Sequence, residues 1–228
     1  MTLPDIETAG LSHRQLNFFL VVDCSGSMAG DKMASLNYAL RAALPAMREA
    51  AADNPETRVM VRVLRFSTGA AWHVEPTPVE AVEWGDLQAD GETHMGAALS
   101  LLAGALTPEG MPGRQLPPVV VLVSDGQPTD TFEDGLARLM ASPYGRKAIR
   151  IAIAIGADAD LDVLTRFIGH PEFRPLQAHN AESLVNRIKW ATTAPVRSVS
   201  TPVTGATPME RLAQEAPAAP PPADAMVW

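Results

Sequence analysis

Small oxygen-bearing side chains gather at three places in this 228-residue chain, in a pattern typical of a divalent-cation site. Asp23, Ser25 and Ser27 share one short loop, and Asp125 stands in a later one. Thr93 lies between them in the sequence, at the predicted start of a helix. Hard cations such as Mg²⁺ take oxygen ligands and keep several waters. Three hydroxyls and two carboxylates therefore predict a weak, open Mg²⁺ or Mn²⁺ site.

The two carboxylates have a different predicted role from the three hydroxyls. If Ser25, Ser27 and Thr93 bind the metal directly, Asp23 and Asp125 act through water or through hydrogen bonds to the hydroxyls. A cation with few direct anionic ligands stays electrophilic, so a carboxylate of a partner protein can complete its shell. The alternative needs no metal: the aspartates cap helices or form turns, and the serines belong to a solvated turn.

These residues follow segments that predict the strands of one sheet. Three continuous apolar runs, 18–22, 119–123 and 149–155, are typical of strands buried on both faces. The alternating segment 58–66 and its successor 70–74 predict a hairpin at the edge of the sheet. Because ligands bind at the carboxyl ends of strands in such sheets, the candidate metal residues lie where a site is expected.

Helical periodicity separates the strands. The predicted helices span 32–52, 93–106, a stretch opened by Thr131, 161–168 and 181–190. Pro45 is expected to kink or break the first of them. The alternation predicts an α/β fold, with a doubly wound, mostly parallel central sheet, helices on both faces and one antiparallel edge strand.

Composition divides the chain into a domain over 1–194 and a tail over 195–228. The tail holds seven of the 20 prolines, is rich in Ala and Thr, and is predicted to be disordered because it cannot bury enough apolar surface. Within it, Thr207 and Glu210 form a capping-box sequence, and 226–228 ends in an aromatic residue. Each of these two features is either a docking motif or plain disorder.

Charge and cysteine content exclude several classes of protein. The net charge of −8 argues against binding to nucleic acids or anionic membranes. The single cysteine, Cys24, excludes an intrachain disulfide framework and a cysteine-rich zinc site. No apolar run approaches the ~20 residues of a membrane-spanning helix, and 1–16 does not resemble a secretion signal. We therefore expect a soluble, cytoplasmic protein.

Three neighbours of the candidate site have open roles. Cys24 is either a redox sensor or a small buried filler, and no basic neighbour in the sequence lowers its pKa. His94 either tunes the site or lies on its rim. Asp130 either binds a partner or caps the helix that follows it.

The stretch 23–27 (Asp-Cys-Ser-Gly-Ser), the later Thr93 and the Asp-Gly at 125–126 resemble the metal-ion-dependent adhesion site (MIDAS) of von Willebrand factor A (VWA) domains. The resemblance implies a divalent ion at the top of the sheet, held by Asp23, Ser25, Ser27, Thr93 and Asp125. It also implies protein binding as the activity rather than catalysis.

A narrower resemblance is to the TerY-type branch of bacterial VWA proteins, which is linked to tellurite resistance. It rests on 23–28, on 91–93 and on 124–130, and above all on the Gln-Pro-Thr-Asp at 127–130. The segment 92–96 departs from the Gly-Thr-Pro-type sequence common in that branch. The likeness implies a signalling or stress-response set with a Ser/Thr kinase and a PP2C-type phosphatase as partners.

We therefore expect a metal-dependent adaptor or scaffold that is not an enzyme. A Mg²⁺-dependent phosphohydrolase is the alternative from another class, but such enzymes usually place a second acid two residues after the nucleophilic aspartate, where this chain has Ser25. The sequence also lacks a glycine-rich phosphate loop. An accessory subunit of an AAA+ ATPase is a further alternative, because other VWA proteins serve such machines.

Overall fold

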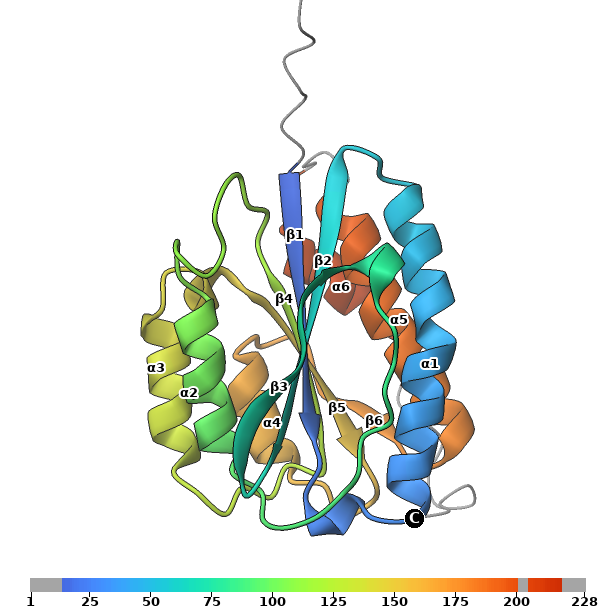
Figure 1. The fold of residues 1–228 in the computed structure, drawn as a ribbon, viewed down its shortest axis with the longest axis vertical. Coiled ribbons are helices and arrows are strands. Elements are labelled where there is room, and N and C mark those ends of the chain that lie inside the picture. Colours follow the sequence, from blue (N-terminus) through green and yellow to red (C-terminus); the bar gives the residue numbers. More distant parts are fainter. Residues whose placement is uncertain (1–13, 201–204, 219–228) are drawn as a thin grey trace, which may run out of the picture.

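The computed structural model describes residues 14–200 and 205–218, and a sheet lies at the centre of this part of the chain (Figure 1). Its six strands have the order β3-β2-β1-β4-β5-β6. Neighbouring strands are parallel except for the pair β2–β3, which is antiparallel. The strands are β1 (Arg14–Asp23), β2 (Thr57–Ser67), β3 (Gly69–Pro78), β4 (Val119–Ser124), β5 (Ile149–Ile155) and β6 (Leu176–Ala178). The predicted mostly parallel α/β sheet with one antiparallel edge strand is confirmed.

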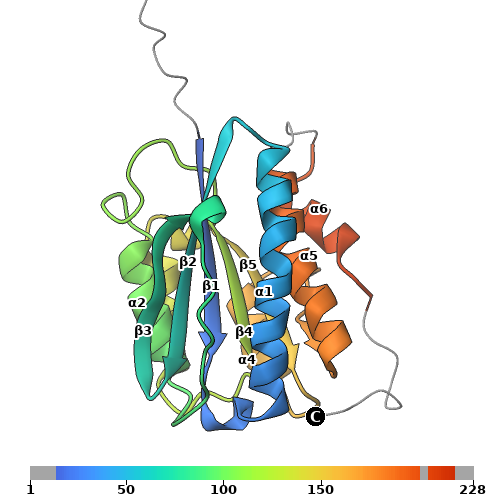
Figure 2. The same ribbon diagram turned by 45° about the vertical axis from the view of Figure 1, so that its right-hand side comes forward.

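Helices cover both faces of this sheet (Figure 2). Helices α1 and α5 pack together on one face with α6 outside α5, whereas α2 and α3 pack together on the other face, and α4 contacts β5. The α-helices are α1 (Asp31–Ala52), α2 (Met95–Ala105), α3 (Phe132–Ala141), α4 (Leu161–Ile168), α5 (Ala181–Ser200) and α6 (Pro208–Glu215). The described residues also form the short 3₁₀ helices η1 (Gly26–Met28), η2 (Val79–Ala81) and η3 (Gly145–Lys147). No helix in the described part is long and apolar enough to span a bilayer.

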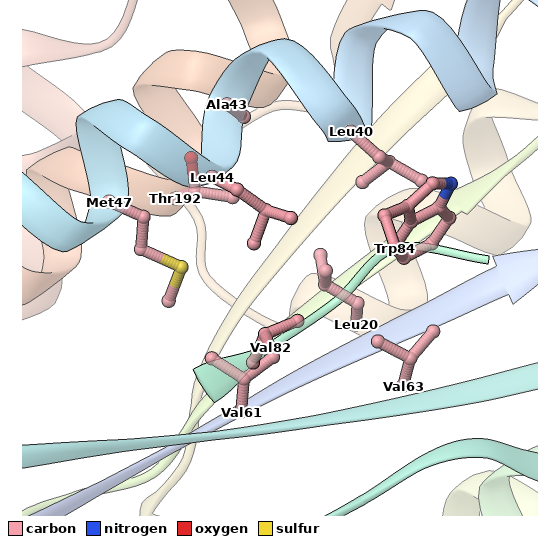
Figure 3. A pocket seen from close by; sticks show the side chains of 10 residues that line it. All are labelled: Leu20, Leu40, Ala43, Leu44, Met47, Val61, Val63, Val82, Trp84 and Thr192. Atoms are coloured by element: carbon pink, nitrogen blue, oxygen red, sulfur yellow. The ribbon is translucent and has the colours of Figure 1, made fainter. Parts of the chain in front are cut away.

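The sheet is apolar because both of its faces are covered. Every residue of β4 and β5 is buried. Figure 3 shows how Leu40, Leu44 and Met47 of α1 face Leu20 of β1 and Val61 of β2. The space left between them is about 10 Å³, roughly what one water molecule needs. This hollow is therefore part of a closed core and not a ligand pocket.

Helix α1 runs through Pro45 as one helix, so the predicted break does not occur. Proline removes one intrahelical hydrogen bond. Ala43 and Met47, two residues before and two residues after it, are buried against the sheet. Packing on both sides of the proline holds the two halves of the helix together.

Helices α2 and α3 meet at two glycines. A Cβ atom on Gly96 would lie 2.4 Å from the carbonyl oxygen of Thr131, and one on Gly135 would lie 2.4 Å from the carbonyl oxygen of Gly96. Side-chain carbons do not approach backbone that closely. The start of α2 can therefore contact α3 at this distance only because both positions lack a side chain.

The structure differs from the predicted disordered tail over 195–200 and 205–218. Helix α5 continues to Ser200, and α6 forms inside the predicted tail. The Thr207 hydroxyl accepts from the Glu210 amide, and the Glu210 carboxylate accepts from the Thr207 amide, so the capping box is formed. Leu212 is fully buried.

The cause of this difference is the packing of α6 against the helix that precedes it. Helix α6 packs along α5, which covers its small apolar face. Arg211 of α6 also donates to the carbonyl oxygen of Ser198 at 2.7 Å. The composition of the tail does not reveal that such a partner is available. The rest of the predicted tail, 201–204 and 219–228, lies outside the described residues.

Candidate metal centre

The predicted site residues stand at the carboxyl edge of the sheet. Strands β1 and β4 are parallel neighbours that end at Asp23 and Ser124, so the loops after them leave from the same edge. In Figure 1 this edge is the lower end of the sheet, where the arrow of β1 points and the chain turns into α1. Thr93 lies two residues before α2 begins. The parallel sheet thus brings together loops that are about 100 residues apart in the sequence.

Asp23 joins the first loop to the third. Its side chain is fully buried. Oδ1 accepts from the amide of Ser25 at 2.8 Å, and Oδ2 accepts from the Ser124 hydroxyl at 2.5 Å. The Ser124 oxygen in turn accepts from the amide of Gly126 at 2.8 Å. Both oxygens of Asp23 are therefore held in place by the protein.

The two serines of the first loop present their hydroxyls side by side. The turn η1 places the Oγ atoms of Ser25 and Ser27 3.0 Å apart. Adjacent ligands of an octahedral ion with metal–oxygen distances of 2.0–2.1 Å are separated by about 3 Å. Ser25 is buried whereas Ser27 is exposed, so the site opens to solvent on the Ser27 side.

The buried side chain of Asp125 gives the clearest indication that a cation belongs in this site. The residue is 4% exposed, and within the described part of the chain its Oδ1 atom is buried with no hydrogen-bond partner. Its backbone is fixed, because its carbonyl oxygen accepts from the amide of Asp160 at 2.7 Å. A buried polar atom without a partner is costly. A cation beside this oxygen would remove the cost, so the residues present fit a bound metal.

The electrostatics of Asp23 support the same interpretation. Burial raises the pKa of Asp23 above its ordinary value, and the hydrogen bonds from Ser124 and Ser25 offset only part of this. The negative charge of Asp125 raises the pKa of Asp23 further. A divalent ion beside these two carboxylates would balance the charge that disfavours ionisation of Asp23.

Thr93 is placed by its backbone. It is 6% exposed, and no hydrogen bond links its hydroxyl to the other four candidate ligands in the described structure. Its amide donates to Thr129 Oγ1 at 3.1 Å, and its carbonyl oxygen accepts from the Thr129 amide at 2.9 Å. The amide of Gly26 donates to the carbonyl oxygen of Gly91 at 2.9 Å. The loop before α2 is thus joined to both of the other loops.

Cys24 has the environment of a buried filler. Burial raises the pKa of its thiol to about 12, with a further contribution from Asp23. The thiol therefore stays protonated at neutral pH, which argues against the redox sensor considered from the sequence.

The other two neighbours have structural partners. His94 Nδ1 accepts from the amide of Gly69 at 2.9 Å, and its Nε2 lies 2.7 Å from the Glu92 carboxylate. His94 therefore braces the β2–β3 hairpin on the rim of the site. Asp130 caps the start of α2 and not the helix that follows it, which corrects the sequence-based expectation. The reason is that the fold, rather than the chain order, brings α2 beside it.

The described residues contain no group of three or more His, Cys, Asp or Glu side chains that could hold a metal. A metal bound at this edge would therefore depend on hydroxyl oxygens together with two carboxylates. Such a donor set suits a hard divalent ion such as Mg²⁺ or Mn²⁺ better than a thiophilic one.

Comparisons with known proteins identify the fold. Residues 18–127 match the family model of the von Willebrand factor type A domain. No curated protein matches the sequence. A von Willebrand factor type A protein from Catenulispora acidiphila has a similar fold, with a TM-score of 0.63 and 18% identity over 81% of this chain and 43% of that one.

Two further solved structures share the fold. The pilus adhesin SpaC from Lactobacillus rhamnosus GG matches with a TM-score of 0.64 and 14% identity over 82% of this chain and 31% of that one. Proximal thread matrix protein 1 from the mussel byssus, solved with a zinc-occupied MIDAS motif, matches with a TM-score of 0.57 and 14% identity over 82% and 46%. The chain thus spans less than half the length of each of these three proteins. Residues 18–127 thus match the model of the von Willebrand factor type A (VWA) domain family, and the described chain has the fold of the solved VWA structures.

Proposed function

We propose that the chain is a metal-dependent protein-interaction module that presents Mg²⁺ or Mn²⁺ to an acidic side chain of a partner protein. The observation that carries the proposal is the buried, unpartnered Oδ1 of Asp125 at a sheet edge that also holds Asp23. This edge opens to solvent beside Ser27, where a partner's carboxylate can approach.

Each candidate residue has a distinct role in this proposal. The hydroxyls of Ser25, Ser27 and Thr93 would hold the ion, and Asp125 would balance its charge from a buried position. Asp23 orients the first loop through the amide of Ser25. Neutral hydroxyl ligands do not cancel the positive charge of the bound ion. The remaining charge favours binding of a carboxylate from a partner protein.

The relatives support interaction as the activity. One protein of the same fold is a pilus adhesin, and another was solved with zinc in its MIDAS motif. Membership in a set with a kinase and a PP2C-type phosphatase is the finer part of the proposal. It rests on the resemblance of 124–130 to the TerY-type branch.

We also propose that the chain is not an enzyme. A phosphohydrolase of the kind considered above uses an aspartate as a nucleophile. Here both oxygens of Asp23 accept hydrogen bonds from within the protein, from the Ser25 amide and the Ser124 hydroxyl. Phosphatase activity that requires Mg²⁺ and disappears in Asp23→Asn would contradict this part of the proposal.

The experiment has two stages. Mn²⁺ binding is first measured by electron paramagnetic resonance for the wild type, for Ser25→Ala/Ser27→Ala, and for a Thr77→Ala control on the edge strand β3. The same proteins then serve as baits in lysate, in Mg²⁺ and in EDTA. We expect a partner retained only by wild type and control, only in Mg²⁺, and released when one Asp or Glu of that partner is replaced.

Two results would contradict the proposal. The first is wild-type protein that binds neither Mn²⁺ nor Mg²⁺ at millimolar concentrations. The second is a set of captured proteins that is identical with Mg²⁺, with EDTA and with the double serine variant. If an AAA+ ATPase is the metal-dependent partner, the adaptor role stands and the kinase–phosphatase set is replaced.

A further inference from the structure

Two consecutive residues tie the loop after β4 to the start of α2. Thr129 exchanges two hydrogen bonds with Thr93: its Oγ1 accepts from the Thr93 amide at 3.1 Å, and its amide donates to the Thr93 carbonyl oxygen at 2.9 Å. Asp130 accepts from the amide of Gly96 through Oδ1 and from the amide of Ala97 through Oδ2, both at 2.8 Å. We call Thr129 and Asp130 together the clasp.

The clasp replaces a cap that α2 does not have. The first amides of a helix have no partners within the helix. His94 stands at the N-cap position of α2, but its side chain makes no capping hydrogen bond. A carboxylate at the positive end of the helix dipole is favourable, and here Asp130 supplies it from another loop. The start of α2 and the loop after β4 are therefore held as one unit.

The clasp also lies between two candidate metal ligands. Asp125 begins the loop that the clasp ends, and Thr93 precedes the helix that the clasp caps. The other end of this loop is fixed at Gly126, whose φ is 72° and where a Cβ atom would lie 2.7 Å from the carbonyl oxygen of Asp160. With both ends of the loop held, the position of Thr93 relative to Asp125 depends on the clasp.

We propose that Thr129 and Asp130 are positioning residues of the metal site, which set its affinity without touching the ion. This inference rests on the proposed function, because it requires that a metal binds among Asp23, Ser25, Ser27, Thr93 and Asp125. The motif Gln-Pro-Thr-Asp at 127–130 then has a mechanical role in this chain rather than a role in contacting a partner.

The coupling has a consequence that a purely structural cap would not have. If the clasp links metal binding to the start of α2, then metal binding must stabilise that start to the same extent. The amides of Gly96 and Ala97 donate to Asp130, so their hydrogen exchange should slow when Mg²⁺ is added.

The test compares metal affinity with stability for matched variants. Thr129→Val keeps the shape and the amide but removes the acceptor for Thr93, whereas Thr129→Ser keeps a hydroxyl. Ser142→Ala is the control, because Ser142 Oγ also makes two buried hydrogen bonds, to Leu139 and Gly145, at the far end of α3. Mn²⁺ affinity is measured by titration, and the melting temperature is measured in EDTA.

We expect Thr129→Val to weaken Mn²⁺ binding about ten-fold or more, the usual effect of losing a residue that orients a ligand. Thr129→Ser should restore affinity to within about two-fold of the wild type. Ser142→Ala should lower the melting temperature while leaving Mn²⁺ affinity unchanged. Asp130→Ala should weaken binding as Thr129→Val does, and it should also abolish the slowing of exchange at Gly96.

The possible failures are distinguishable. Suppose that the wild type binds Mn²⁺ and that Ser25→Ala/Ser27→Ala does not. If Thr129→Val then binds Mn²⁺ as tightly as the wild type, the clasp is only structural. This inference is overturned in that case, while the proposed function stands. If wild type does not bind the metal, both are overturned. Should Asp130→Ala fail to fold, Thr129→Val and Thr129→Ser still decide the matter.

Discussion

Replacing one buried carboxylate should change the stability of this domain in opposite directions with and without metal. Asp125→Asn keeps the size of the side chain but removes a negative charge near Asp23 on a carboxylate whose Oδ1 has no hydrogen-bond partner in the described structure. An unsatisfied buried group costs about 1–3 kcal/mol. Removing the charge recovers part of this cost. Because the amide of Asn is still polar, we expect a recovery at the lower end of the range. In EDTA the variant should match the wild type or exceed it by up to about 1 kcal/mol.

In Mg²⁺ the order should reverse. Weak Ca²⁺ sites of extracellular modules have dissociation constants on the order of 10⁻⁴–10⁻³ M, and we take the same range for Mg²⁺ at this open site. At about 10 mM free Mg²⁺, such a site adds about 1.4–2.7 kcal/mol to the folded state. A domain of this size shifts by about 2–4 °C per kcal/mol, so wild type should gain about 3–11 °C. A ten-fold or greater loss of affinity in Asp125→Asn would reduce that gain by about 1 kcal/mol or more, which equals or exceeds the largest advantage expected in EDTA.

The assay is differential scanning calorimetry in EDTA and in Mg²⁺ at constant ionic strength. Asp158→Asn is the matched control, because it makes the same charge change at an exposed position in the next loop. It should leave the Mg²⁺ shift at its wild-type size. Two results would refute the reasoning: an Asp125→Asn protein that loses several kcal/mol in EDTA, or one that gains as much from Mg²⁺ as the wild type does.

Three further predictions follow from side chains away from the ligands. With its pKa raised from 9.0 to about 12, Cys24 should react with iodoacetamide at pH 8 about a thousand-fold more slowly in the native protein than in urea, as mass spectrometry can check; equal rates would contradict its burial. Arg150→Met should cost about 3 kcal/mol in urea unfolding, because the guanidinium donates to three buried carbonyl oxygens, whereas Arg166→Met at an exposed ion pair should cost less than about 1 kcal/mol. Leu212→Ala should speed hydrogen exchange throughout α6 without changing exchange in β4, because the buried Leu212 side chain holds α6 on the domain and does not hold the sheet together. Equal acceleration in α6 and β4 would contradict this.

The sheet was largely predictable because its strands are continuous apolar runs. The segments 149–155 and 161–168 form a strand and a helix with the predicted bounds. Strand β6 was missed, because its three residues are too short to produce a pattern. Helix α6 was recognised only as a capping box, because the cover that α5 gives it is a packing contact that no local pattern indicates.

The sequence indicated which residues gather at this edge of the sheet, but not the hydrogen bonds that hold them in place. Spacing alone placed Asp23 and Asp125 after parallel strands. The hydrogen bond from Ser124 to Asp23 joins residues 101 positions apart, and no local pattern indicates it. The same holds for Asp130, whose sequence position favours the following helix although the fold places α2 beside it. Partners of this kind are set by the stacking of elements, which a single sequence does not encode locally.

The glycine contact between α2 and α3 limits how this sequence can evolve. A larger residue at Gly96 cannot be accommodated by a smaller one at Gly135, because that position already has no side chain, and the reverse is equally true. Substitution at either position must move one helix, and α2 carries the loop of Thr93 with it. Lineages that lose either glycine should therefore lose the metal ligands as well, so that the two features disappear together over evolutionary time.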